Sequence, residues 1–574
     1  MTEKQLPIEK LKTRYNQLNA ERSKNTSVWD AIDQYVDLSK NYGDIKDSHV
    51  EEPSAYIAVN QASDYLIGVL WGTGEDVFKI IPSKYVLQRA ANNELASWYG
   101  FVTKESSYQI NHEEAGFMNS LKPYAISQFT KGNSGIGAFK NPDYKSGKSD
   151  NLFVFRYYGV ENSAIDDGLN GVVNTISTDY TWSVNRIIAE FCTIDGEFSE
   201  KLMSTLPDEI KQAYESGLFD KTFNLVHIII PRADYNPKLL GKKGTKYTGY
   251  WYHEDVIFIE EDYAEFPIPF ARQIRVADSP YGVSSGSMLI STIRNINFLM
   301  ELSIDSAEKT TAPALGMWNN ALVGDAVLDT SELSIFNSEL AGNQSPIFKL
   351  FDTGDITPLI QYLIPYLNDK ITTAFKVDML LDFNSDHTMT ATETMKRSII
   401  RGKALSGMLI QQKNDFEVPF IKRVVTASYD EGLFSSDQSD ELLAFSGATN
   451  QIIPQAVLDT IADGKPWFEI QFNNELEKLV RTDTIEDLLK TIQTVQMIAS
   501  VYPPIVDAVD WYAILDKINS LLDPNSQVLI GAKNFKQLII DQANQQQEMI
   551  RMQQAEQASS ITATQAKAEK TRNE

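Results

Sequence analysis

Histidine and cysteine, the side chains that most often bind transition metals or act in catalysis, are few and scattered in this sequence. The 574 residues include five histidines and one cysteine. They are His49, His112, Cys192, His227, His253 and His387. No two histidines stand at the spacing of a metal site, and one cysteine cannot complete a zinc site. We therefore predict no metal, no cofactor and no catalytic centre.

Two glycine-rich segments have the composition of phosphate-binding loops. Residues 132–137 (Gly-Asn-Ser-Gly-Ile-Gly) do not follow a clear strand, do not end in Gly-Lys-Ser/Thr and have no ribose-binding carboxylate downstream. We predict a surface turn there. Residues 241–245 (Gly-Lys-Lys-Gly-Thr) have the wrong spacing for a P-loop and indicate a basic hairpin tip. The sequence therefore predicts no nucleotide-binding site.

Length and composition indicate a folded chain of two to four domains, with 43% hydrophobic and 10% aromatic residues. No stretch is apolar enough to span a membrane, and the N-terminus lacks a signal-peptide core. Cys192 is expected to be a buried small hydrophobe in a reducing compartment. We expect synthesis in the cytosol and no membrane partner.

The charge is strongly acidic, with 52 basic and 77 acidic residues and a net charge of −25. A protein that grips nucleic acid by its phosphates normally has a basic face. Two interpretations stay open. The acidic surface serves only solubility, or it faces DNA without holding it.

The elements that would position any functional side chains are two long helices, predicted over 284–311 and 358–381. Serines 284, 285 and 287 are candidate N-caps of the first helix. In the second, Thr357 is a candidate N-cap, Pro358 occupies the first helical position, and Pro365 should bend the helix.

Between these helices, residues 312–356 form an acidic segment with short strands predicted at 334–336 and 346–351. After the second helix, the polar stretch 382–387 breaks the helical pattern. Thr390 and Glu393 then form a capping box that starts a helix towards Asp430, bent at Pro419.

The remaining chain is predicted as mixed helix and strand, α+β and mainly α-helical. Antiparallel strands are expected within 152–184, at 225–230 and over 247–260. Helices are expected at 7–40 (in two pieces, with Ser27 as an N-cap), 54–70, 86–114, 115–130, 184–192 and 197–217. The glutamine-rich C-terminus is interpreted as a polar helix supported by neighbours, with disorder as the alternative.

Several segments, taken in order, resemble the head-to-tail connecting (portal) proteins of short-tailed, T7-like bacteriophages. They are Arg22 with 29–35 (Trp-Asp-Ala-Ile-Asp-Gln-Tyr), 60–70 (Asn-Gln-Ala-Ser-Asp-Tyr-Leu-Ile-Gly-Val-Leu) before Phe78-x-Ile80, 279–282 (Ser-Pro-Tyr-Gly), 293–297 (Ile-Arg-Asn-Ile-Asn), 310–313 (Thr-Thr-Ala-Pro) and 390–393 (Thr-Ala-Thr-Glu). The resemblance covers about residues 10–430.

The resemblance implies a portal-type fold with wing, helical stem, small β-containing clip and helical crown. In this chain the regions would be the wing (1–280 and 391–475), the stem helices (281–312 and 357–381), the clip (313–356), the tunnel loop (382–390) and the crown (476–574). It also implies a ring of twelve subunits at one capsid vertex of the virion, assembled in the host cytoplasm.

The same resemblance implies a non-enzymatic role in DNA packaging and ejection. Implied partners are double-stranded DNA, the large terminase, tail adaptor and tail tube proteins, the major capsid protein and scaffold, and internal core or ejection proteins. The implied gate is Asp382, Phe383, Asn384, Ser385, Asp386 and His387. Channel-proximal charges would be Asp369, Lys376, Lys396, Arg397 and Arg401, and docking residues Asp325, Asp329, Glu332, Phe348 and Phe351.

Three alternatives stay open. The basic cluster around Arg397, including Lys403, also fits a solvated helix face or intersubunit ion pairs. The whole chain also fits a cytosolic helical scaffold or adaptor that never contacts DNA, or a hydrolase with an unrecognised site. An open ring would separate the portal from both.

Overall fold

The computed structural model describes residues 8–37, 52–72, 77–90, 92–145, 147–194, 197–236, 241–311, 315–318, 333–336, 347–349, 359–375, 407–434, 453–472, 488–498, 514 and 552. By its contacts the chain divides into Met1–Asn474 and Glu475–Glu574. In the second unit, residues 488–498 are helical. The first unit contains all the sheets that the structure describes.

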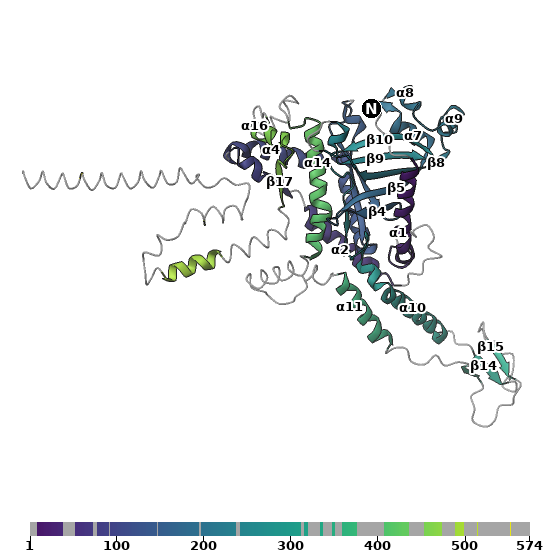
Figure 1. The fold of residues 1–574 in the computed structure, drawn as a ribbon. Coiled ribbons are helices and arrows are strands. Elements are labelled where there is room, and N and C mark those ends of the chain that lie inside the picture. The colour runs from purple at the N-terminus through teal and green to yellow at the C-terminus, as the bar shows by residue number, and fades with distance from the viewer. Residues whose placement is uncertain are drawn as a thin grey trace, which may run out of the picture. The chain divides into compact units, whose positions relative to one another are not determined.

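The largest sheet has five antiparallel strands in the order β10-β9-β8-β5-β4 (Figure 1). Its strands are β4 (Ser163–Asp167), β5 (Val173–Ser183), β8 (Thr222–Pro231), β9 (Tyr247–His253) and β10 (Val256–Tyr263). The antiparallel strands expected in this region are confirmed. A cluster of buried hydrophobic side chains lies on each face of the sheet, where helices pack against it.

Helix α1 (Ile8–Tyr35) covers one face of this sheet. Its Leu11 and Leu18 pack with Ile228 and Tyr250. The two-piece helix predicted here is wrong, because α1 is continuous through Ser27. Buried residues 11, 18, 29 and 32 fall on one side of a single helix, so one helix satisfies them all.

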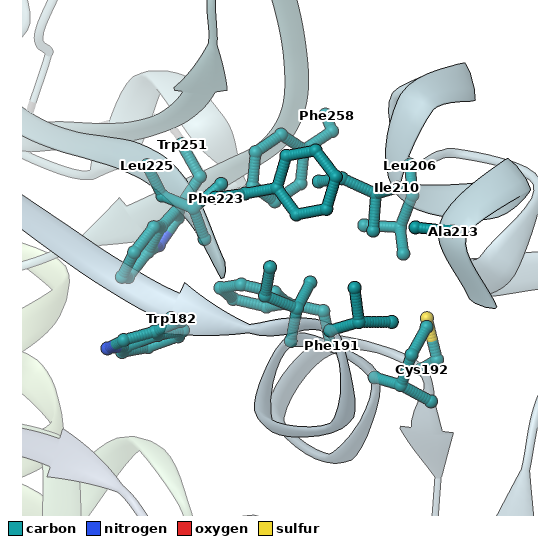
Figure 2. Close-up of a cluster of buried hydrophobic side chains, with 13 residues drawn as sticks. Trp182, Phe191, Cys192, Leu206, Ile210, Ala213, Phe223, Leu225, Trp251 and Phe258 are labelled. Carbon is teal, nitrogen blue, oxygen red and sulfur yellow. The ribbon is translucent and has the colours of Figure 1, made fainter. Parts of the chain in front are cut away.

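The opposite face of the sheet packs against α7 (Val184–Phe191), α8 (Glu200–Met203) and α9 (Asp208–Glu215) (Figure 2). The ring centroids of Phe191 lie 5.0 Å from Trp251 and 5.4 Å from Phe258. Cys192 is fully buried in this cluster, as expected. The short strands β6 (Thr193–Ile194) and β7 (Glu197–Phe198) follow α7.

A second, antiparallel sheet has the order β11-β2-β3. It consists of β2 (Asn133–Lys140), β3 (Phe153–Gly159) and β11 (Phe270–Arg272). Helices α5 (Phe117–Thr130) and α14 (Val418–Asp430) pack against it, and α2 (Ser54–Trp71) packs on α5. The ring of Phe420 stacks 5.1 Å from Phe117 and lies 5.3 Å from Phe155, which ties α14 to residues far earlier in the chain.

The surface turn predicted for residues 132–137 is wrong, because this segment begins the buried strand β2. A Cβ at Gly135 would lie 2.7 Å from the carbonyl oxygen of Pro269, and one at Gly137 would lie 2.7 Å from the Tyr158 ring. The glycines therefore permit close packing of strands, a reason for glycine in a strand that does not involve phosphate.

The first unit also contains several further described elements. They are α3 (Lys84–Leu87), α4 (Asn92–Asn111), η2 (Glu113–Ala115), α6 (Pro142–Lys145), η3 (Lys242–Gly244), α16 (Gln455–Ala462) and the strand pairs β1–β17 (Phe78–Pro82 with Phe468–Phe472) and β12–β13 (Ile274–Arg275 with Gly282–Val283). The single helix predicted over 86–114 is therefore wrong at its start, since α4 begins at Asn92.

After β13 come α10 (Ser285–Thr311), β14 (Leu315–Trp318), β15 (Leu333–Phe336) and β16 (Ile347–Lys349). A π-helical turn η5 (Leu359–Leu363) then leads into α11 (Ile364–Ala374). Further on, helical residues 407–412 precede a second π-helical turn, η6 (Lys413–Glu417), and α14. The chain is thus mixed helix and strand with several small sheets, which confirms the predicted α+β class.

Candidate functional site: the α10–α11 helix pair and its root

Helix α10 begins with a reciprocal serine cap. The Ser284 Oγ accepts a hydrogen bond from the Ser287 backbone N–H at 2.8 Å, and the Ser287 Oγ accepts one from the Ser284 N–H at 3.0 Å. Such a capping box satisfies two backbone donors that the first helical turn leaves free. The N-cap expected from the serine run is therefore confirmed at Ser284.

The sequence around this cap, Gly282-Val283-Ser284-Ser285-Gly286, also has the Gly-x-Ser-x-Gly spacing of a hydrolase nucleophile elbow. The structure gives it another role. Ser284 is fully buried, and its hydroxyl donates to the Thr130 carbonyl while accepting from Ser287. A serine whose hydroxyl is used in this way holds the start of a helix in place.

An amide side chain of β2 holds Gly282, two residues before the cap. Asn133 Nδ2 donates to the Gly282 carbonyl at 3.0 Å, and Asn133 Oδ1 accepts from the Gly282 N–H at 2.7 Å. On the other side, Gln273 Oε1 accepts from the Ser285 N–H at 2.7 Å. Asn133 at the start of β2 and Gln273 after β11 therefore fix the root of α10, by which we mean residues 282–287 and their partners.

Gly286 lets α10 approach the end of α5 closely. A Cβ at this position would lie 3.0 Å from the carbonyl oxygens of both Phe129 and Thr130. Gly132, with φ +76°, shows the same crowding from the other side, since its Cβ would lie 2.8 Å from the Ser284 nitrogen. Glycine is required at both positions because backbone atoms, which cannot move aside like a flexible side chain, occupy the space.

A buried polar network connects the root to the helix that leads into η6. The Tyr124 hydroxyl donates to Gln412 Oε1 at 2.5 Å, and Gln412 Nε2 donates to Gln128 Oε1 at 2.9 Å. Gln128 Nε2 then donates to the Ser134 Oγ at 2.7 Å. Burial, followed by the nearby charges of Glu417 and Asp415, raises the pKa of Tyr124 well above its usual value. This hydroxyl therefore stays protonated and remains a donor.

Arg272 supplies the buried charge of the root. Its guanidinium lies 3.1 Å from Asp415 in η6 and 3.2 Å from Asp167 in β4, and it donates to the Gly171 carbonyl. Arg272 and Asp415 are almost fully buried, at 1% and 2% exposed. A buried charge is tolerated only when it is paired and hydrogen-bonded, so these contacts fix three separate segments to one another.

Beyond the root, α10 and α11 lie side by side (Figure 1). The root side of this helix pair is covered, since α10 also packs against α1 and α5, and α11 against α2. Farther along, large apolar side chains are exposed. They are Met288, Phe298, Leu302 and Ile304 of α10, Tyr362 of η5 and Tyr366 of α11. Phe298 and Leu302 stand one turn apart on the same side of α10.

Both prolines predicted to bend helices follow a π-helical turn. Pro365 is the second residue of α11 after η5, and Pro419 is the second residue of α14 after η6. Proline has no N–H to donate and clashes with the carbonyl four residues earlier, so the preceding turn widens. The α-helical pattern is thus interrupted at both prolines, while the bends themselves stay predictions.

Of the site residues predicted from the sequence, the structure describes two. Asp369 lies exposed on α11, and Phe348 lies in β16, where its backbone pairs with Gly316 of β14. The others lie outside the described residues, namely Asp325, Asp329, Glu332, Phe351, Lys376, Asp382, Phe383, Asn384, Ser385, Asp386, His387, Lys396, Arg397 and Arg401. The implied gate, channel and docking roles thus remain predictions.

A three-stranded sheet lies in the chain between α10 and α11. Its central strand β14 runs parallel to β15 and antiparallel to β16. The strands expected at 334–336 and within 346–351 are confirmed as β15 and β16. Strand β14 is not predicted from the sequence, although Leu315-Gly-Met-Trp318 is apolar, because so short an apolar run does not by itself indicate a strand.

The comparison with protein families decides the class of the chain. Residues 8–528 match the family model described as "Bacteriophage head to tail connecting protein". The chain belongs to this family. The suspected resemblance is therefore confirmed, and the match extends well beyond residue 430, where the resemblance found in the sequence ended. No curated protein matches the chain. None of the described helices is long and apolar enough to cross a membrane.

Solved structures with weak similarity come from gene transfer agent (GTA) particles. A chain of "Neck of empty GTA particle computed with C6 symmetry" has 11% identity and a TM-score of 0.30, covering 73% of this chain and 91% of that one. A chain of "Virion of native gene transfer agent (GTA) particle" has 10% identity and a TM-score of 0.25, covering 68% and 94%. TM-scores this low do not establish a shared arrangement of elements.

Proposed function

We propose that copies of this chain form a ring at one capsid vertex, through which double-stranded DNA enters the head during packaging and leaves during ejection. The observation that carries the proposal is the family match over residues 8–528. The ring, its twelve subunits and its vertex are inferred from the resemblance. In this proposal the chain is a structural component of the virion, and a separate terminase supplies the energy.

Within the described residues, the helix pair has an exposed apolar surface suited to contact with a neighbouring copy. Phe298 and Tyr362 are 58% and 76% exposed. Large apolar side chains are more often exposed at interaction surfaces than elsewhere on a soluble protein. A second copy beside α10 and α11 would cover them, and repetition of the same contact around an axis would close a ring.

The acidic composition fits a conduit better than a binding surface. Each copy has a net charge of −25, and a ring repeats every acidic side chain around the axis. In a narrow channel the wall lies within about one Debye length of the DNA, roughly 8–10 Å, so repulsion persists at physiological salt. A basic wall would instead bind the duplex through counterion release and slow its movement.

Within this ring we assign α10 and α11 to the stem and residues 313–356, with strands β14–β16, to the clip. The clip would dock the terminase first and the tail adaptor later, through Asp325, Asp329 and Glu332. Replacing Asp325 and Asp329 with lysine should weaken both complexes in pull-down assays with purified terminase and adaptor. Unchanged binding of both partners would exclude this docking role.

Residues 382–390 would form the tunnel loop, with Asp369, Lys376 and the basic cluster around Arg397 near the channel. Deleting 383–387 should leave ring assembly intact but cause loss of packaged DNA. The measurement is the DNA content of purified heads. Heads that retain full-length DNA after this deletion would rule out a gate at these residues.

The intersubunit contact is tested by Leu302→Asp, with Leu218→Asp as the matched control. Leu302 on α10 and Leu218 after α9 are 42% and 54% exposed. A charge buried in an interface core typically costs over 1.4 kcal/mol, so the half-assembly concentration of Leu302→Asp should rise by about tenfold or more. Leu218→Asp should assemble like wild type. Equal assembly of both variants in native mass spectrometry would remove α10 from the interface.

A further inference from the structure

We propose that Glu209, His253 and Glu254 form a Zn²⁺ site on the edge of the large sheet. One ligand atom from each residue lies within 4.8 Å of the other two. Glu209 belongs to the first turn of α9, whereas His253 ends β9 and Glu254 begins the turn to β10. The sequence alone could not show this set, because Glu209 lies far from the other two along the chain.

The orientation of His253 is fixed with one nitrogen free to bind a metal. Its Nδ1 lies 2.7 Å from the Asn224 carbonyl oxygen, so we assign the ring proton to Nδ1, which donates there. Nε2 then has a lone pair. Metal-binding histidines usually have this arrangement, with the other ring nitrogen donating to a carbonyl or carboxylate.

The free nitrogen is buried and points into the cluster. His253 is 9% exposed, and its Nε2 has no hydrogen-bond partner among the described residues. The nearest carboxylate oxygen is Oε2 of Glu209, at 3.9 Å. The ring also packs edge-on against Phe223, with centroids 5.5 Å apart, so it cannot easily turn to solvent. A buried nitrogen without a partner is costly, and a metal ion would satisfy it.

Neither carboxylate forms an ion pair with a lysine or arginine that the structure describes. The neighbouring basic side chains are used elsewhere, since Lys211 pairs with Asp208 at 3.0 Å and Lys12 pairs with Asp255 at 2.5 Å. The Glu254 backbone has φ 48°, in the left-handed region, so its side chain does not continue the up-and-down alternation of the side chains of β9. Two carboxylates and a neutral imidazole together have the charge that a divalent cation would balance.

The backbone that presents these ligands is well supported. Figure 2 shows Ile210 and Ala213 of α9 pointing into the buried cluster beside Phe223 and Phe258. Glu209, which precedes Ile210, is therefore fixed relative to the sheet. Its side chain is 61% exposed and is therefore free to adjust so that the carboxylate reaches a shared ion.

The ligand types favour Zn²⁺ over Ca²⁺ and Mg²⁺. Ca²⁺ and Mg²⁺ prefer oxygen ligands alone, whereas Zn²⁺ binds imidazole nitrogen at about 2.0–2.1 Å and carboxylate oxygen at about 2.0–2.2 Å. Three protein ligands leave a fourth position of a tetrahedral ion for water. Bound Zn²⁺ would connect α9 to the β9–β10 turn within one subunit, so the proposal is independent of ring formation.

The test is isothermal titration calorimetry, in which Zn²⁺ is added to the purified full-length protein after its metal has been removed. Wild type should bind one Zn²⁺ per chain at this site, and Co²⁺ should give visible absorption bands. Glu254→Gln and Glu209→Gln should each weaken Zn²⁺ binding by about tenfold or more. Even the loss of a residue that only hydrogen-bonds to a metal ligand typically weakens metal binding by about that factor. In His253→Asn, the new amide can still donate a hydrogen bond to the Asn224 carbonyl. The nitrogen that would bind the metal is gone, so this variant should also lose Zn²⁺ binding.

The matched control is Glu215→Gln, at the exposed last residue of α9, which should bind Zn²⁺ like wild type. Circular dichroism checks that each variant is folded. Wild-type protein that binds no Zn²⁺, or Glu209→Gln and Glu254→Gln variants that bind as tightly as the control, would overturn the proposal.

Discussion

At the scale of single residues, the root of α10 depends on the buried guanidinium of Arg272. Arg272 is enclosed by Asp415, Asp167 and the Gly171 carbonyl, which come from three segments. Nothing in the sequence marks this arginine. Its partners are distant along the chain, and a lone arginine at the end of a short strand is more often exposed.

Arg272→Leu should lower the free energy of unfolding by about 3–5 kcal/mol, because it leaves Asp415 buried without its cation. Urea unfolding followed by tryptophan fluorescence measures the loss. Arg275→Leu is the control, since Arg275 is 41% exposed and 3.8 Å from Asp167, and should cost under about 1 kcal/mol. Similar losses in both variants would contradict the role given to Arg272.

Glu105 makes the folding stability depend on pH, and a single substitution can test this contribution. It is 4% exposed and accepts a hydrogen bond from Gln109 at 2.9 Å. Burial raises the pKa of Glu105, and the bond from Gln109 lowers it by less. Because the folded pKa exceeds the unfolded one, the stability from this group is present below about pH 4.5 and is lost as pH rises through the folded pKa.

Glu105→Gln should therefore raise the melting temperature at pH 8 and leave it nearly unchanged at pH 4. Differential scanning calorimetry at both pH values measures this difference, with the exposed Glu113→Gln as control. A Glu105→Gln variant that is less stable than wild type at pH 8 would show that the carboxylate is favoured in the folded state.

At the scale of elements, the position of α10 depends on its close approach to α5 at Gly286. Gly286→Ala should destabilise the protein by about 1–3 kcal/mol, because the new methyl group would meet two backbone carbonyls at 3.0 Å. Gly100→Ala in α4 is the matched control, since nothing lies within 4 Å of its Cβ position. It should stabilise the protein by about 0.5–1 kcal/mol.

Thermal unfolding of the two alanine variants measures these changes. The change in stability should have opposite signs in the two variants. Both substitutions improve helix propensity, but only Gly286→Ala creates a clash. A stabilising effect at Gly286 would mean that α10 is free to shift at its root.

The sequence predicted elements well where local chemistry specifies them. The serine cap and apolar spacing located α10, and prolines 365 and 419 located two interruptions. It failed where distant contacts decide the outcome. Residues 132–137 looked like a turn but form a buried strand, because glycines that suit a loop also suit close packing between strands. The buried partners of Arg272 and His253 were invisible for the same reason.

At the scale of the whole molecule, the proposed function connects an acidic chain to a channel. The family match over residues 8–528 makes a head-to-tail connector the class of this protein. In this proposal, the exposed apolar side chains on α10, η5 and α11 would form the surface that a second copy covers. The net charge of −25 per chain would then line or surround a passage that repels DNA phosphates.

The wing, stem, clip and crown assignments follow from the resemblance and stay predictions, as do the gate and docking residues outside the described part of the chain. What the sequence could supply here was the order of parts. It could not supply the number of subunits, since that number depends on the angle between neighbouring copies, which no single chain specifies by pattern.

Cryo-electron microscopy of the purified full-length protein tests the central claim most directly. The account predicts closed rings viewed along an axis with an open centre wide enough for a DNA duplex, and with α10 and α11 at the contacts between subunits. Particles that remain monomeric at every concentration, or assemblies without a central opening, would contradict it.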